Sequence, residues 1–103
     1  MPGVNFRLVR EQITMRDVLR LLQFEARVVR GDQWRGPCPV HGSNPRSRSL
    51  SVNVRLGRYH CFVCGSHGNA LELWSAVRSV NLHAAAVELC QLLGMEVPWV
   101  KRW

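Results

Sequence analysis

The chain has 103 residues and a net charge of +7, from 14 basic and 7 acidic residues. This length is typical of a single domain, and a content of 47% hydrophobic and 20% charged residues excludes a wholly disordered chain. No stretch approaches the roughly 18 apolar residues of a membrane span, and residues 1–16 lack the apolar core of a secretory signal. We therefore expect a cytoplasmic protein that makes no membrane contact.

The first third of the chain predicts one helix and two short strands. Apolar residues alternate within residues 1–13, which predicts either a weak strand or a loose terminus. From Thr14 the apolar residues follow a helical period, and Thr14 with Asp17 has the spacing of a capping box, so a helix is expected to begin there. Residues 27–30 and 33–36 are expected to form two short strands around a turn.

The central segment predicts further antiparallel strands. A polar loop over residues 42–48 is followed by residues 49–56, whose alternation is typical of a half-buried strand. The residues expected to face the core from this strand are Leu50, Val52, Val54 and Leu56. After a turn at Gly57, residues 58–62 are expected to return as the partner strand.

Two helices are expected to close the chain. Asn69 can cap the first, with Glu72 at its third position. Asn81 can cap the second, which would end at Gly94. The predicted fold is α+β, with a small antiparallel sheet, one helix before it and two after it.

Four residues at matched spacing predict a metal site. Two residues separate Cys38 from His41, two separate Cys61 from Cys64, and nineteen lie between the pairs. Two such turns can complete the tetrahedron that structural zinc prefers, whereas disulfides are rare in a reducing compartment. Because all four positions would be filled by protein, we expect one structural Zn²⁺ in a zinc-ribbon sheet and no catalytic water.

Other histidine and cysteine residues are weaker candidates for ligation. His67 is a rival of His41, because a compact Cys-x2-Cys-x2-His arrangement can also bind metal. His60 adjoins Cys61, but neighbours on a strand point to opposite faces. Cys90 lies on an apolar helical stripe and is expected to be a small buried hydrophobe.

The positive charge is concentrated near the expected metal site. Thirteen of the basic residues are arginine, and no acidic residue occurs between Gln33 and Leu71. This window contains Arg35, Arg46, Arg48, Arg55 and Arg58. Arginine binds phosphate bidentately and stacks on bases, so the block indicates a polyanionic partner. A basic surface that only maintains solubility is the alternative.

The run from Arg35 to Trp99 resembles the N-terminal zinc-binding domain of bacterial and phage DNA primases. The matching segments are Pro37-Cys38-Pro39-Val40-His41, Ser49-Leu50-Ser51-Val52, Tyr59-His60-Cys61-Phe62-Val63-Cys64-Gly65, His67-Gly68-Asn69-Ala70 and Leu93-Gly94-Met95-Glu96-Val97-Pro98. The resemblance implies a domain of residues 14–98, with 1–13 as an extension and 99–103 as a tail. It also implies contact with single-stranded template DNA through the sheet and the basic loop beside the zinc.

The sequence departs from that family in two ways. The segment between His41 and Cys61 is longer than is common there, and Arg48-Ser49-Leu50 replaces the usual Pro-Ser-Phe. A primase also needs a catalytic domain whose clustered carboxylates hold magnesium, and seven scattered acidic residues cannot provide one. We therefore expect a module that is not an enzyme by itself.

The expected nucleic-acid contacts combine arginines with aromatic rings. Arg46 matches a basic residue of the family's loop after the zinc histidine. Trp34, Tyr59 and Phe62 could offer rings for stacking, with core packing as the alternative, which is favoured for Phe62. The predicted contact residues are Trp34, Arg35, Arg46, Arg48, Arg55, Arg58 and Tyr59.

Two further functions are left open by the sequence. The chain could be an adaptor that acts in trans on a primase catalytic subunit, a helicase or a transposase. Its apolar contact would consist of Val97, Trp99, Val100 and Trp103. A redox sensor based on the zinc thiolates is permitted by the Cys-x-x-Cys pair.

Overall fold

The computed structural model describes residues 3–42 and 44–100. Its elements are α1 (Phe6–Gln12), α2 (Met15–Leu21), β1 (Val28–Arg30), β2 (Gln33–Gly36), β3 (Leu50–Asn53), β4 (Arg58–Cys61), β5 (His67–Asn69), α3 (Ala70–Arg78) and α4 (Leu82–Leu92). The architecture is α+β, which confirms the predicted fold class. No helix within the described ranges is long and apolar enough to cross a membrane.

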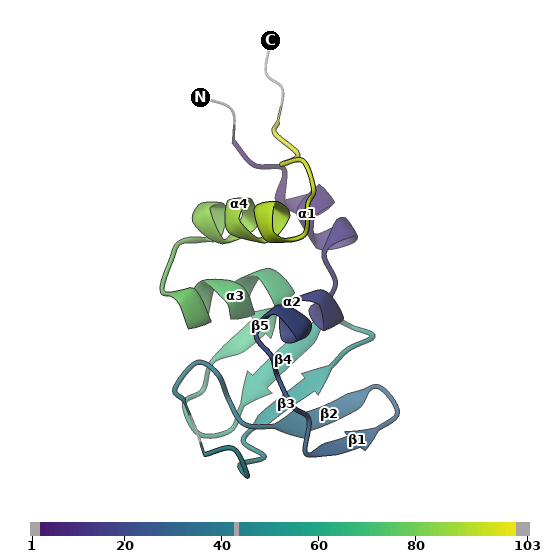
Figure 1. Cartoon of the computed structure of the whole chain (residues 1–103), viewed down its shortest axis with the longest axis vertical. Helices are drawn as coiled ribbons and strands as arrows, with labels where there is room; N and C mark the ends of the chain where they lie inside the picture. The colour runs from purple at the N-terminus through teal and green to yellow at the C-terminus, as the bar shows by residue number, and fades with distance from the viewer. Residues whose placement is uncertain (1–2, 43, 101–103) are drawn as a thin grey trace.

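The five strands form an antiparallel meander in the order β1-β2-β3-β4-β5 (Figure 1). Trp34 pairs with Val52, and Val52 pairs with Tyr59, so these three side chains share one face of the sheet. The positions that alternate with them form the other face, which we call the open face. Apart from Val28 its members are polar, and most are exposed: Arg30, Gln33, Arg35, Ser51, Asn53, Arg58, His60 and His67.

The helices pack in tiers beyond the apolar face of the sheet (Figure 1). Helix α3 packs on β4 and β5, α2 packs against α3, and α4 packs on the other side of α3. Leu50 and Val52 of the sheet, Leu73 of α3 and Leu89 of α4 are fully buried in one core. The open face is therefore free to contact a partner.

Two capping boxes begin helices where the sequence predicts them. The Thr14 hydroxyl accepts from the Asp17 N–H (3.2 Å), and the Asp17 carboxylate accepts from the Thr14 N–H (3.0 Å). Asn69 and Glu72 exchange the same bonds at 2.8 and 3.1 Å. These bonds satisfy backbone donors that have no partner within the helix. The second box lets α3 begin directly after β5.

The N-terminal segment differs from its prediction of a weak strand or a loose terminus. Residues Phe6–Gln12 form α1, whose cap is Asn5, which accepts from the N–H of Leu8. Val9 and Ile13 are buried in the common core. The alternation of apolar residues was misleading because one helical turn can also produce it over so few positions.

Two details of the sheet also differ from the prediction. Strand β3 ends at Asn53, so Leu56 lies in the following turn and is 60% exposed instead of facing the core. Strand β5 was not predicted, because its three residues are too few to show an alternating pattern. It pairs with β4 and completes the edge beside the second pair of cysteines.

The contrast between Leu50 and Leu56 can be tested by truncation. Leu50→Ala should lower the free energy of unfolding by about 2–5 kcal/mol, because it leaves a cavity in the core. Leu56→Ala removes the same atoms from an exposed turn and should change it by less than about 0.5 kcal/mol. Urea unfolding of both variants with zinc present would measure the difference. Equal losses would contradict the assigned end of β3.

Candidate metal centre and basic face

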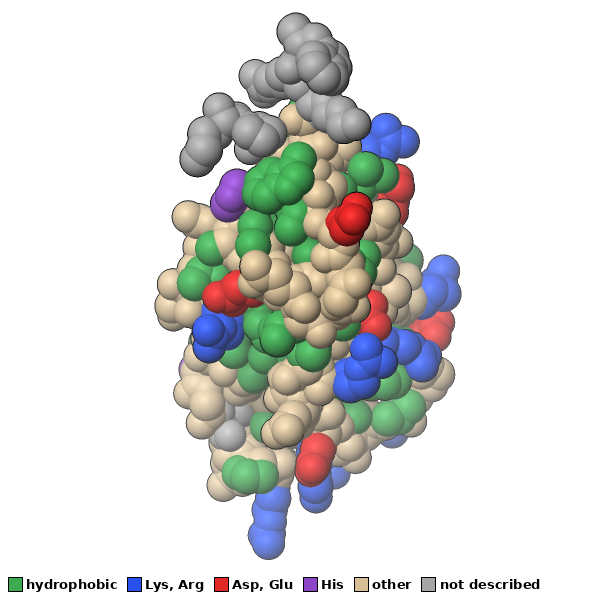
Figure 2. All heavy atoms as spheres, turned by 45° about the horizontal axis from the view of Figure 1, so that its top comes forward, with side chains coloured by type: hydrophobic (Ala, Val, Ile, Leu, Met, Phe, Trp, Pro, Cys, Tyr) green, Lys and Arg blue, Asp and Glu red, His purple; other side chains and the backbone are tan. Residues whose placement is uncertain are grey.

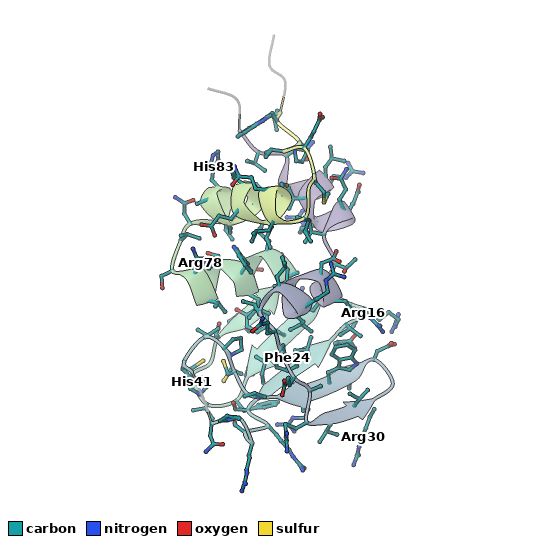
Figure 3. The ribbon with its side chains drawn as sticks, in the orientation of Figure 1. Arg16, Phe24, Arg30, His41, Arg78 and His83 are labelled. Atoms are coloured by element: carbon teal, nitrogen blue, oxygen red, sulfur yellow. The ribbon has the colours of Figure 1, made fainter. Side chains whose placement is uncertain are left out.

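Two turns at one end of the sheet bring the four expected ligands together. Cys38 and His41 lie in the turn that follows β2, Cys61 ends β4, and Cys64 lies in the turn to β5. Their ligand atoms are all within 4.8 Å of one another. Figure 3 shows His41 beside the sulfur atoms of this group. Two segments that are distant in sequence are thus joined at one point.

The distances within this group fit one tetrahedral zinc ion. The sulfur atoms of Cys38 and Cys64 are 3.9 Å apart, and the Cys61 sulfur lies 3.7 Å from Nδ1 of His41. Zinc–sulfur and zinc–nitrogen bonds of about 2.3 and 2.05 Å at tetrahedral angles predict about 3.8 and 3.6 Å. None of the four cysteines, all of which are described, is in a disulfide. The group could hold one zinc ion.

Glycines shape the backbone around the centre. Gly42 follows His41 with φ +65°, and Gly65 follows Cys64 with φ +77°, a conformation that other residues rarely adopt. At Gly36 a Cβ atom would lie 2.7 Å from the Phe24 ring, so β2 can approach that ring only as glycine. Glycine at positions 42 and 65 thus allows the backbone to turn sharply after each ligand pair, and Gly36 allows β2 to pack closely on Phe24.

Hydrogen-bond donors and burial shift the thiol pKa values of Cys61 and Cys38 in opposite directions. The Cys61 sulfur accepts from the N–H groups of Val63 and Cys64, each at 3.4 Å. Burial raises the pKa of Cys61, but these donors and hydrogen bonds to Cys64 and Cys38 outweigh burial and lower the pKa to about 6. Burial raises the pKa of Cys38 to about 11. A bound divalent cation would neutralise the buried Cys38 thiolate and so favour loss of its proton.

The other candidate ligands lie outside this group. Nδ1 of His67 is 3.1 Å from the Gly65 carbonyl oxygen and does not join the cysteines. His60 is exposed while Cys61 is buried, as expected for neighbours on a strand. Cys90 is fully buried in the core on α4, which agrees with its interpretation as a small hydrophobe.

The predicted arginines have different environments. Nε and Nη2 of Arg35 donate to the Arg48 carbonyl oxygen at 3.1 and 2.7 Å, and its guanidinium lies 4.9 Å from the centre of the Phe62 ring. Arg55 forms an ion pair with Asp32 at 3.1 Å, which compensates part of its charge. Arginine side chains project at the sheet end in Figure 2. Arg35 is the most constrained of the predicted contacts.

Arg46, Arg48 and Arg58 are all exposed. Arg58 lies on the open face, and the other two lie in the loop that leads to β3. Arg30 belongs to the same surface but was not predicted, because Asp32 separates it in sequence from the acid-free window. Position in the sheet, rather than proximity in sequence, brings it close to Arg35.

The structure corrects the prediction for two aromatic residues. Tyr59 is only 4% exposed and its hydroxyl lies 2.7 Å from that of Ser66, so its ring offers no face to a base. Phe62, which was expected in the core, is 62% exposed. Its position between two ligands, at the tip of a tight turn, was the signal that its side chain cannot reach the core. Its ring lies 5.0 Å from the His60 ring.

Trp34 is half-buried on the apolar face of the sheet. The Arg16 guanidinium lies over its ring, 5.2 Å from the centroid. This contact already uses one face of the indole. The Arg35 guanidinium uses one face of the Phe62 ring in the same way, but Phe62 is more exposed than Trp34 or Tyr59 and so presents more free aromatic surface beside the metal centre.

Comparisons with known proteins agree with this geometry. The model of the CHC2 zinc finger family (Zn_ribbon_DnaG) matches residues 5–102. DNA primase of Haemophilus influenzae is 29% identical over 91 residues, which are 87% of this chain and 15% of that protein. DNA primase of Treponema pallidum is 35% identical over 68 residues, which are 66% of this chain and 11% of that protein.

A solved structure has the same fold. The crystal structure of the Aquifex aeolicus primase, with its zinc-binding and RNA polymerase domains, matches with a TM-score of 0.74 and 25% identity. The match covers 92% of this chain and 23% of that one. The present chain thus spans less than a quarter of the length of these relatives.

The choice between the two histidines can be tested by paired substitutions. His41→Ala should weaken zinc binding by more than about 100-fold, because loss of a ligand exceeds the effect of an outer-shell change. His67→Ala should leave the affinity unchanged. Competition with a chromophoric chelator measures both affinities. If His67→Ala loses the metal and His41→Ala retains it, the assigned ligand set is wrong.

Proposed function

This chain belongs to the CHC2 zinc finger family, and on that basis we propose that it is a zinc-dependent module that binds single-stranded DNA. The ligands of the single zinc are Cys38, His41, Cys61 and Cys64. Four protein ligands leave no position for a reactive water, so the metal is structural. Its binding is worth about 10–16 kcal/mol, which is comparable to or larger than the whole stability of most small domains. The sheet end of the fold therefore depends on zinc.

The observation that supports DNA binding most strongly is the pairing of Arg35 with the exposed ring of Phe62. Proteins that bind single strands combine a positively charged surface along the backbone with aromatic rings that contact the bases. Arg46, Arg48 and Arg58 supply the positive charge on and beside the open face. The Phe62 ring takes the stacking role that had been predicted for Tyr59. In duplex DNA the faces of the bases are stacked on one another and are not available to such a ring, so a single strand is favoured.

These residues are proposed to supply nucleic-acid contact and no catalytic chemistry of their own. Among the described residues, the Cys-His-Cys-Cys group is the one cluster of three or more potential ligands. Its relatives are DNA primases of much greater length, so the chain would contribute template contact to primer synthesis performed elsewhere. A primase catalytic subunit, a helicase or a transposase is the proposed partner, and the metal thiolates favour the reducing cytoplasm.

An adaptor function is the second candidate, because apolar side chains are exposed on the helical tiers. Trp99 is 44% exposed, bridges to Val4 and lies 5.8 Å from the His83 ring. Leu82 and Leu92 of α4 are also exposed. Trp103, which was predicted to join this surface, lies outside the described residues. A partner captured in pull-downs after nuclease treatment, together with absence of DNA binding, would favour this function.

DNA binding can be tested by its dependence on salt. The logarithm of affinity for a single-stranded oligonucleotide should fall linearly with the logarithm of salt concentration, with a slope of about −0.7 for each phosphate contacted. Arg46→Ala combined with Arg58→Ala should reduce both the affinity and the slope, as measured by fluorescence anisotropy.

The matched control combines Arg7→Ala with Arg10→Ala on α1, which removes the same charge from the other end of the molecule. It should leave the slope unchanged. Absence of binding at low salt would contradict the proposed function. An equal loss in the control would contradict the assigned surface.

A further inference from the structure

A hollow of about 240 Å³ lies on the open face, at the β1–β2 side of the sheet. The lining residues are Val28, Arg30, Gln33, Arg35 and Arg48. Three of them are arginines and none is acidic. Such a concentration of guanidinium groups around one hollow raises the local positive potential and favours an anion.

The strand register creates this cluster from residues that are separate in sequence. Val28 pairs with Arg35, and Arg30 pairs with Gln33, so all four side chains share the open face. Arg30 is labelled in Figure 3 on β1, where it points away from the helical tiers. Arg48 joins them from the loop before β3. The hollow is thus built by the sheet itself and by one well-defined loop contact.

Arg35 is held in place before any ligand binds. Its Nε and Nη2 atoms both donate to the Arg48 carbonyl oxygen, at 3.1 and 2.7 Å, and its guanidinium carbon lies over the Phe62 ring. A guanidinium fixed in this way loses little conformational entropy on binding. The bonds also tie the Arg48 backbone to the sheet, which keeps the third arginine near the hollow.

The charge of these arginines is not matched by nearby acidic groups. The ion pairs between described residues are Arg7–Glu11, Arg20–Asp17, Arg55–Asp32 and Arg78–Glu88. None of them includes Arg30, Arg35 or Arg48. A bound anion would relieve the repulsion among the three guanidinium groups.

We propose that this hollow binds a terminal phosphate group. An internal phosphodiester carries one charge, whereas a terminal phosphate carries about −1.5 to −2 at neutral pH and has three oxygens that accept hydrogen bonds. Three guanidinium groups match this group in charge, and their N–H donors suit its oxygens. The group could belong to a nucleoside triphosphate or to the 5′ end of a strand. The inference concerns the same face as the proposed function but does not require binding along a strand.

Calorimetric titration of the zinc-loaded chain with inorganic tripolyphosphate at low salt tests the site. Arg30→Gln and Arg48→Gln should each weaken binding by about tenfold or more, the effect of losing a charge-assisted hydrogen bond. Arg10→Gln removes the same charge from α1, away from the hollow and from the proposed DNA-binding surface, so it should change affinity by less than about twofold. Circular dichroism and zinc content after titration verify that each protein stays folded and keeps its metal.

Two further ligands distinguish the sources of the phosphate. A nucleoside triphosphate is compared with its nucleoside, and a 5′-phosphorylated trinucleotide with its 5′-hydroxyl form. Preference for either phosphorylated ligand, lost in Arg48→Gln, supports the site and identifies its source. No preference in both pairs, or an equal loss in Arg10→Gln, overturns it. Binding of long 5′-hydroxyl oligonucleotides would persist in that case, so the proposed function is tested separately.

Discussion

The metal-ligand group at the end of β2 and β4 is the constraint on which the sheet depends. The meander has one apolar face, covered by helices, and one polar face, so hydrophobic burial acts on a single side. The turns that follow β2 and β4 lie beyond the helical tiers (Figure 1). A cross-link of four ligands supplies there the cohesion that a small core cannot. Removal of the metal would release the two turns from each other.

This constraint explains why the open face can be both polar and ordered. In a sheet that is covered on one side only, the strands are normally held in place by packing on the covered side and by their hydrogen bonds to neighbouring strands. Here the metal centre fixes one end of the strands, and the Asn69–Glu72 capping box fixes the start of α3 directly behind β5. Arg35 and Arg48 are then linked through backbone contact. The surface needs little rearrangement to bind a ligand, which favours affinity.

The same arrangement separates two surfaces of different chemistry. The sheet end exposes Phe62 beside arginines, a combination suited to nucleic acid. The helical end exposes Trp99 and Leu92, a combination suited to a protein partner. Because α2 and α3 lie between the two ends (Figure 1), both surfaces could be occupied together.

The sequence by itself determined the metal-ligand group and the capped helix starts, because each depends on a short spacing within one segment. Paired ligands, and a cap and its partner, are each three positions apart. Tertiary structure alone decided how deeply each side chain of the covered face is buried. Alternation places Tyr59 on the same face as Val52, but only packing beneath α3 shows that its ring is too buried to contact a base. The approach of Arg30 to Arg35 likewise follows from strand register, since a one-residue shift would place them on opposite faces.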